Sequence, residues 1–182
     1  MENMKYMENE YKVFEMFSRQ WALVSAGSIE KHNACTVSWG SLGTLWTRPG
    51  KSGATVTVYI HPSRYTYELL KENEYFTVSF FPQKYKKALG YMGSHSGRNE
   101  NKDEAAGLTV TEAGESVTYK EAEMTFVCRK IYAHQLTVED IASDVQDYYR
   151  ANPTVYPGDK EGQWQPHYVF VGEIVDVLKE GE

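Results

Sequence analysis

The sequence predicts a mainly β fold, a β-barrel carrying short peripheral helices. Three observations predict it. Short runs rich in β-branched and aromatic residues recur along the chain, and 54–60 (ATVTVYI) alternates most clearly. Helical spacing of apolar residues is confined to short segments between these runs. Regular strand–helix–strand alternation is missing from the pattern, which argues against a doubly wound parallel sheet.

The N-terminal residues 1–20 are predicted to form a helical extension. Val13, Phe14 and Phe17 lie at helical spacing, so we expect a short amphipathic helix over 10–19. A polar loop then separates two runs with strand character. These runs predict a strand pair at 21–26 (WALVSA) and 33–38 (NACTVS).

The strand 54–60 is the best strand signal in the chain, and His61-Pro62 ends it. Ser63 is the predicted N-cap of a short helix over 64–73, because a serine hydroxyl can accept a bond from a free N–H of the first turn. The next predicted elements are a strand at 75–81 and a short helix that Pro82 opens and that ends near Gly90 or Gly93.

The second half of the chain is predicted to alternate between loops and strands. Residues 94–107 are polar and contain glycine, so we expect a loop there. Thr137 is the predicted N-cap of a helix over 137–151, and 152–166, with three prolines and two glycines, is predicted to be loop. The predicted strands are near 108–111, near 117–120, at 122–133 and at 167–178.

Length and composition fit a single ordinary domain over 1–182, with 137–166 as a helix and loop insertion. The net charge of −6 argues against nucleic-acid binding, which favours basic surfaces. The sequence shows neither a secretory signal nor an apolar run long enough to span a membrane. Cys35 and Cys128 form no CxxC pair, so a reducing cytoplasm is the expected compartment.

Two groups combine cations with hydroxyl and glycine residues. A phosphate monoester needs fixed positive charge together with hydroxyl and backbone N–H donors. Both groups supply these parts, although a helix cap plus a solvated loop would give the same composition. The first group is Ser63, Arg64 and Thr66, and the second is Ser94, Ser96, Gly97, Arg98 and Lys102.

The run 33–49 carries two tryptophans that could stack on or enclose a flat heterocycle. Trp39 and Trp46 are these residues, and backbone N–H groups near Thr36 and Ser38 could reach the polar edges of such a ring. The alternative is that both tryptophans fill the core or a subunit interface. Composition does not decide between these interpretations.

Other kinds of site have little support in the sequence. The five histidines show no metal-ligand spacing, so no metal site is expected. Nucleophile and dinucleotide-binding motifs such as GxSxG and GxGxxG are missing. His167 opens the last predicted strand and is the one catalytic candidate, as a proton donor. A surface or interface histidine would fit the same position.

Several motifs, in order, resemble those of the flavin reductase-like proteins, which include the flavoredoxins. The similarity covers about 21–135 and, loosely, the C-terminal strand. Each motif is weak alone, and five in register are stronger. The motifs are NACTVSW (33–39), GTLWTRP (43–49), HPSRYT (61–66), FTVS (76–79) and SGRNENK (96–102).

This resemblance implies a split β-barrel that dimerises and holds FMN non-covalently near the subunit interface. Two positions differ from the pattern of the family: Cys35 stands where methionine or another apolar residue is often found, and Asn99 replaces the usual aspartate. The ring of the flavin would meet Asn33, Thr36 and Trp39, with Trp46 nearby. The phosphate and ribityl end would meet Ser63, Arg64, Thr66, Ser96, Gly97 and Lys102.

The resemblance also implies a function, NAD(P)H-dependent reduction of flavin, with the nicotinamide as co-substrate. Two alternatives stay open. One is an electron carrier that keeps FMN tightly bound and exchanges electrons with a redox-protein partner. The other is a flavin- or haem-binding module without turnover. The expected partners are a second copy of the chain and an electron donor, with neither nucleic acid nor membrane.

Overall fold

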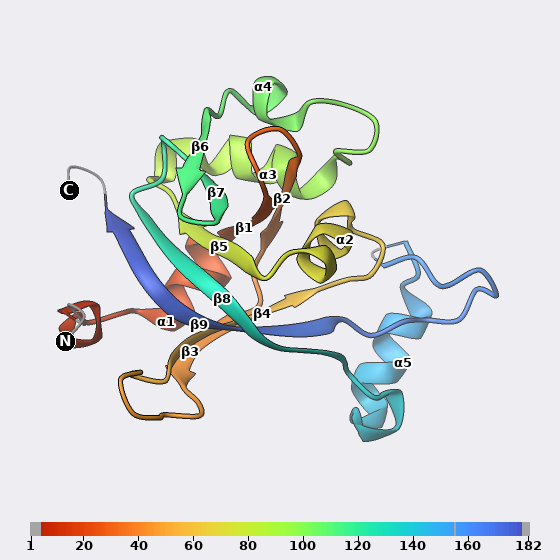
Figure 1. The fold of residues 1–182 in the computed structure, drawn as a ribbon. Coiled ribbons are helices and arrows are strands. Elements are labelled where there is room, and N and C mark those ends of the chain that lie inside the picture. The colour runs from red at the N-terminus through yellow and green to blue at the C-terminus, as the bar shows by residue number, and fades with distance from the viewer. Residues whose placement is uncertain (1–4, 155, 180–182) are drawn as a thin grey trace.

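A curled antiparallel sheet organises the computed structural model, which describes residues 5–154 and 156–179. Seven strands in these ranges form it in the order β2-β1-β5-β8-β9-β4-β3 (Figure 1). A separate hairpin pairs β6 (Val110–Ala113) with β7 (Ser116–Tyr119). The strands of the sheet are β1 (Ala22–Gly27), β2 (His32–Val37), β3 (Gly40–Thr44), β4 (Ala54–Ile60), β5 (Tyr75–Phe80), β8 (Met124–Gln135) and β9 (Tyr168–Lys179).

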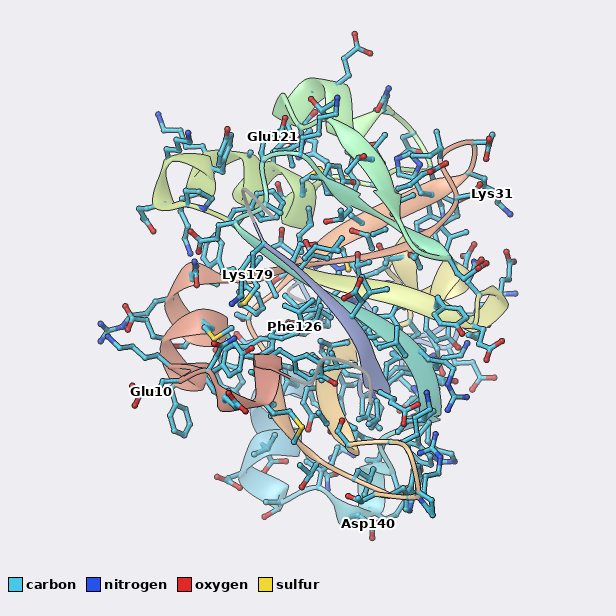
Figure 2. The ribbon with its side chains drawn as sticks, turned by 60° about the vertical axis from the view of Figure 1, so that its left-hand side comes forward. Glu10, Lys31, Glu121, Phe126, Asp140 and Lys179 are labelled. Atoms are coloured by element: carbon cyan, nitrogen blue, oxygen red, sulfur yellow. The ribbon has the colours of Figure 1, made fainter. Side chains whose placement is uncertain are left out.

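The long strands β8 and β9 give the sheet its curl. They pair along most of their length, and the register shifts between Val127 and Cys128 and between Lys130 and Tyr132. Such bulges bend a strand and increase its twist. The main apolar core lies inside the curl, where Phe126 is fully buried, while Glu10, Lys31 and Asp140 lie at the periphery of the view (Figure 2).

Three short helices and the β6–β7 hairpin lie around one end of the sheet (Figure 1). They are α2 (Tyr65–Glu72), α3 (Lys86–Ser94), which follows the 3-10 turn η3 (Gln83–Tyr85), and α4 (Lys102–Ala106). A second apolar cluster, which includes Leu23, Leu89 and Tyr119, fills the space between them and the sheet. The mainly β fold with short peripheral helices confirms the predicted fold class.

The N-terminal segment is helical, as predicted, but its buried face differs. The turns η1 (Lys5–Glu8) and α1 (Val13–Glu15) lead into a π-helical turn, η2 (Met16–Gln20). Met16 and Phe17 are buried, whereas Phe14 is 93% exposed. A π turn adds a residue per turn and so rotates the following side chains, which the 3.6-residue spacing could not predict.

Gly40 shows why β3 accepts the N-terminal segment. A Cβ atom at Gly40 would lie 2.3 Å from Cε1 of Phe17, so only glycine leaves room for this ring. The ring of Phe17 packs edge-on against Phe80 at 5.4 Å between centroids. The run 40–44 (GSLGT) holds a single apolar residue, so its sequence pattern does not predict a strand.

Three local predictions are corrected by the structure. Residues 102–106 form α4 inside the predicted loop, capped by the side chain of Asn101, which accepts a bond from the N–H of Glu104. Arg64, not Ser63, occupies the N-cap position of α2. Thr137 caps no helix with its side chain, since a 3-10 turn, η4 (Val138–Asp140), intervenes and α5 (Ser143–Ala151) begins later.

The segment 137–166 lies away from the main core. Among its described residues, no side chain of α5 is buried, and the rest of the segment is largely irregular. The other predicted strands and helices agree with the structure to within a few residues. In the described part of the chain, no helix is long and apolar enough to cross a membrane.

Candidate functional site

Two cavities meet where β2, the end of β4 and the start of α2 come together. We call the one around Trp39, Tyr156 and His167 the aromatic cavity, and the one around Thr66 and Lys102 the polar cavity. Cys35 and Arg64 line both, so the two cavities are neighbours on either side of these residues. Each has a volume of about 70 Å³.

These cavities bring together nearly all the residues that the sequence singled out. The aromatic cavity is lined by Thr36, Ser38, Trp39, Arg64 and His167. The polar cavity is lined by Asn33, Ser63, Arg64, Thr66, Ser96, Gly97 and Lys102. Two segments that are far apart in the chain, around positions 64 and 102, therefore face the polar cavity together.

Trp46, predicted to lie near the flavin ring, is the exception, because within this chain it lines neither of the two cavities. It lies in the loop between β3 and β4, is 56% exposed and has a positive φ of 50°. Its ring is 6.3 Å from that of Tyr132 on β8, and it lines neither cavity. The strand β3, which the sequence did not predict, carries it away from Trp39.

Arg64 is the free cation at the junction of the cavities. Its backbone N–H donates to the carbonyl of His61 at 3.0 Å, which fixes the turn into α2. Its side chain is half-buried, and within 5–154 and 156–179 it forms no ion pair. A half-buried guanidinium without a counter-ion favours an anion beside it.

Lys102 supplies a second cation, held rigidly at the first position of α4. It is only 4% exposed, and its Nζ donates to the carbonyls of Ala34, at 2.6 Å, and Met92, at 3.0 Å. An ammonium has three donors, so one is left for the cavity. Burial lowers the pKa of Lys102, which an anion in the cavity would reverse.

Asn33 and Gly97 form a tight backbone cradle beside this lysine. Asn33 donates through Nδ2 to the hydroxyl of buried Thr66 at 2.6 Å. A Cβ atom on Gly97 would lie 2.0 Å from Oδ1 of Asn33, so any larger residue would force the loop away. The loop backbone can therefore approach the strand closely only because position 97 is glycine.

Arg98 braces the two cation-bearing segments instead of facing the cavity. Its guanidinium donates to the carbonyl of Ser63 at 3.1 Å, pairs with Glu68 and lies 5.2 Å from the ring centroid of Tyr65. It thereby ties the loop 94–101 to the start of α2. Two of its five donors are used in these contacts, and it lines neither cavity, so we assign it a structural role.

The aromatic cavity is walled by rings from three parts of the chain. The ring centroids of Trp39 and His167 are 4.7 Å apart, and Tyr156 stacks on His61 at 4.9 Å. Tyr156 belongs to the segment 137–166 and covers the cavity from outside. Sequence reasoning missed His61 and Tyr156 here, because only the fold brings them to Trp39; the aromatic richness of that segment was the available signal.

The two histidines are held neutral. The N–H of Ser63 donates to Nδ1 of His61 at 3.2 Å, so Nε2 carries the proton and donates to the carbonyl of Gln165 at 3.2 Å. Burial lowers the pKa of His61 to about 4. Burial, with smaller contributions from His61 and Arg64, lowers the pKa of His167 to about 3. Near pH 7 neither ring is a cationic proton donor in this arrangement.

Two predicted residues have roles that the sequence did not show. The hydroxyl of Thr36 donates to the carbonyl of Leu89 at 2.6 Å, so it anchors α3 to β2. The hydroxyl of Ser63 lies 2.8 Å from Nδ1 of His61 and helps to hold that ring. Both residues line the cavities, but their hydroxyls already have partners.

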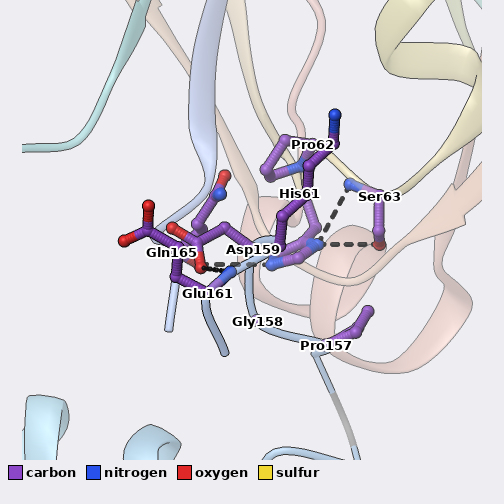
Figure 3. Close-up of a pocket in the computed structure, with 9 residues that line it drawn as sticks. His61, Pro62, Ser63, Pro157, Gly158, Asp159, Glu161 and Gln165 are labelled. Carbon is purple, nitrogen blue, oxygen red and sulfur yellow. Dashed lines mark hydrogen bonds between the residues drawn. The ribbon is translucent and has the colours of Figure 1, made fainter. Parts of the chain in front are cut away.

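A larger open cavity of about 740 Å³ lies beside the aromatic one (Figure 3). One wall is His61, Pro62 and Ser63, and the other is the loop 157–165. His61 stands in the wall that this cavity shares with the aromatic cavity. The two cavities therefore lie on either side of His61.

The curled half-barrel and its cleft beside the start of α2 define the class of protein. The fold is the split barrel of the flavin reductase-like proteins. The chain belongs to this family, since the family model described as flavin reductase like domain matches residues 14–182. The resemblance seen in the sequence is thereby confirmed.

Solved structures share the fold at low sequence identity. An FMN-binding protein from Thermus thermophilus with bound p-hydroxybenzaldehyde has a TM-score of 0.63 and 22% identity, covering 88% of this chain and 71% of that one. Flavoredoxin from Methanosarcina acetivorans gives 0.63 and 21%, covering 89% and 69%. Nitrilotriacetate monooxygenase component B from Bacillus cereus gives 0.65 and 17%, covering 98% and 76%. Among curated proteins, none matches the chain in sequence.

Proposed function

We propose that this chain binds FMN non-covalently and is an oxidoreductase that takes electrons from NADH or NADPH. The observation that carries the proposal is the free, half-buried Arg64 facing the same cavity as Lys102. The neighbours named as an FMN-binding protein and as a flavoredoxin support flavin as the ligand.

The polar cavity fits a phosphate ester in its chemistry. Arg64 and the remaining donor of Lys102 would offset the negative charge, and Ser96 would add a hydroxyl donor. The close approach of Gly97 to Asn33 leaves backbone exposed to the ligand in place of a side chain. The residues therefore fit the phosphate end of FMN, with the ribityl chain passing Thr66 and Cys35.

The aromatic cavity fits the flavin ring only if its cover moves. Its volume of about 70 Å³ is smaller than a three-ring heterocycle. The rings of Tyr156 and His167 lie 6.0 Å and 4.7 Å from the ring of Trp39 and line the same cavity. We infer that the loop around Tyr156 opens when the ring enters, and that Trp39 and Ser38 then line the ring.

A bound flavin would supply the hydride and electron chemistry, so no side chain need act as a nucleophile. The protein would bind, orient and shield. Arg64 would hold the phosphate end, Trp39 would exclude water from one side, and neutral His61 would keep the wall beside the open cavity fixed through Gln165. His167 stays the catalytic candidate. Its neutral imidazole would donate one hydrogen bond near the edge of the flavin ring.

The open cavity beside His61 favours the reductase over an electron carrier, because a nicotinamide donor needs access beside the flavin. The flavoredoxin likeness supports the carrier as the second candidate. Stopped-flow mixing of the FMN-loaded protein with NADH or NADPH separates them. Fast bleaching of the flavin band supports the reductase. No bleaching with either donor, but bleaching by a reduced ferredoxin, supports the carrier.

The absorption spectrum of the protein with added FMN tests the shared claim first. We expect a shifted flavin band and quenched flavin fluorescence, since Trp39 would lie against the ring. A protein that leaves both unchanged at every FMN concentration would exclude the flavin assignment, including a module without turnover. The same titration with haem tests the remaining alternative.

We also propose a homodimer, located in the cytoplasm. Leu45, Trp46 and Tyr132 are all exposed, at 38%, 56% and 43%, and Trp46 lies beside Tyr132. Apolar and aromatic side chains grouped on a surface are typical of interfaces. A second copy covering them would give Trp46 a role that it lacks within one chain. Light scattering of the purified protein checks the dimer, and a monomer at micromolar concentration would contradict it.

A further inference from the structure

His32 forms two hydrogen bonds that only a protonated ring can make at the same time. Its Nδ1 lies 3.0 Å from the carbonyl oxygen of Ser28, and its Nε2 lies 2.7 Å from Oδ2 of Asp103. A carbonyl and a carboxylate are acceptors, so each nitrogen must carry a proton. The hydrogen bond that His32 donates to Asp103 also raises the pKa of the His32 imidazole.

Asp103 is fixed on its other side as well. The hydroxyl of Tyr119 on β7 donates to Oδ1 of Asp103 at 2.6 Å. Burial would raise the pKa of Asp103, but the hydrogen bonds from His32 and Tyr119 hold the pKa below its usual value. The carboxylate therefore stays charged and joins α4 to two strands, β2 and β7.

These contacts are adjacent in sequence to two residues of the polar cavity. His32 precedes Asn33, and Asp103 follows Lys102. Lys102 holds the same helix to the same strand through the carbonyl of Ala34. The helix α4 is thus attached to β2 on both sides of Asn33, so we infer that a change in one attachment would shift Lys102 at its first position.

We propose that protonated His32 is a positioning residue for the phosphate half of the site, and that losing its proton weakens the binding of phosphate-bearing ligands. This inference rests on the proposed FMN function. A neutral ring keeps one bond and gives up the other, so either the turn at Ser28 or the helix α4 loosens. The effect reaches the ligand through Lys102 and Asn33, since His32 itself does not line the polar cavity.

Other charged groups surround the ring and set the field around it. Tyr119 lies behind Asp103 on β7. The hydroxyl of Ser28 donates to Glu30, which keeps that carboxylate on the turn. His32 lines a surface groove, separate from the polar cavity, whose other charged residues are Glu30 and Lys31 from the turn, Glu100 from the loop, and Lys102, Asp103 and Glu104 from α4.

The sign of the pH effect follows from the protonation state. FMN affinity should be highest where His32 is charged and should fall as the pH rises through the raised pKa of His32. Titration of the ligand phosphate does not cause this fall in affinity, because above about pH 6.5 the phosphate is already mostly a dianion. Riboflavin, which has no phosphate, should show no such fall.

The experiment measures FMN and riboflavin dissociation constants by fluorescence quenching between about pH 6.5 and 9, with the intact chain. For the native protein we expect the FMN constant to rise about fivefold or more, the lower end of usual coupling between sites. In His32→Gln, residue 32 cannot titrate. The FMN dissociation constant of this variant should therefore be high and should not change with pH. His134→Gln, at an exposed histidine, is the matched control and should keep the native profile.

Nitrogen NMR of the ligand-free protein provides a second measurement that needs no flavin and no variant. Both ring nitrogens of His32 should be protonated at low pH, and the amide signals of α4 should shift with the same midpoint as the ring. A ring already neutral near pH 6.5, or α4 signals that ignore its titration, would overturn the inference.

The two proposals fail in different ways. FMN binding with a flat pH profile, or the same slope in His32→Gln, overturns the role of His32 alone. An equal slope for riboflavin also overturns it, because the effect would then not act through the phosphate. Absence of FMN binding at every pH overturns the proposed function and this inference with it.

Discussion

At the scale of single residues, the difference between a cation that binds a ligand and one that stabilises the fold lies in its partners. Arg98 is paired with Glu68, and both Arg48 and Arg129 contact the carboxylate of Glu173. Arg64 forms no such pair in the part of the chain that the structure describes. The sequence showed that these cations existed, but it could not show which were already neutralised.

Arg64→Ala should weaken FMN binding by about 1.5–3 kcal/mol, the usual worth of a hydrogen bond to a charged group. The fold should be unaffected, because within the described residues the Arg64 side chain forms no ion pair. Parallel titrations with FMN and riboflavin measure the effect. Equal losses for both flavins would show that Arg64 does not contact the phosphate.

Lys102→Ala should lose FMN affinity by a similar amount and should also lose stability, since the carbonyls of Ala34 and Met92 lose their donor.

Gly97→Ala should disturb the polar cavity through a single methyl group. The new Cβ would lie 2.0 Å from Oδ1 of Asn33, so the loop must move, at a cost of about 1–3 kcal/mol in stability or in FMN affinity. Gly90→Ala on α3 is the matched control, because a Cβ there meets nothing within 4 Å. Thermal unfolding and FMN titration of both variants check this. Similar behaviour of the two would contradict the cradle.

At the scale of elements, the strands with strong alternation were predictable and the short irregular pieces were not. The patterns of β4, β5 and β9 reflect the burial of alternate or successive apolar side chains, a local property of the sequence. The strand β3 has little apolar content, and α4 is only five residues long. Their formation depends on Phe17 and on Asp103 finding distant partners, which a local pattern does not contain.

The segment 137–166 matters for access to the site, and Tyr156 is its contact with the aromatic cavity. Tyr156→Ala should speed FMN association several-fold, because the ring that stacks on His61 and borders Trp39 would be gone. Stopped-flow fluorescence measures the rate. Tyr148→Ala, which removes a 60% exposed ring from the same segment, is the control and should leave the rate unchanged. An unchanged rate in Tyr156→Ala would mean that this ring is no barrier.

At the scale of the whole molecule, the site exists because the sheet curls. In the sheet order, β2 lies at one edge and β4 next to the other edge, yet the two strands contact each other beside the cleft. Bulges bend a strand and increase its twist, and those in the pairing of β8 and β9 contribute to the curl that brings β2 and β4 into contact. The family motifs located the site residues in the sequence. A local pattern could not show the curl of the sheet, nor that the fold brings His61 to Trp39.

Global stability should depend on pH through the two neutral histidines of the site. The pKa of His61 is lowered to about 4 and that of His167 to about 3, so in the folded state both stay neutral at pH 5. In the unfolded chain they take up protons below about pH 6.5, so the unfolded state is favoured as the pH falls. Between about pH 7 and 5, each histidine should lower the free energy of unfolding by about 2 kcal/mol.

Other groups act differently in this range. The raised pKa of His32 gives a contribution that is complete below about pH 6.5 and is lost only at higher pH. Burial favours the protonated form of Glu173, but Arg129 and Arg48 keep its pKa lowered, so its stabilisation is lost only on further acidification. Urea unfolding of the native chain and of His61→Asn with His167→Asn, near pH 7 and pH 5, separates these effects. The double variant should lose most of the decrease, and an equal decrease in both proteins would show that the histidines are not the cause.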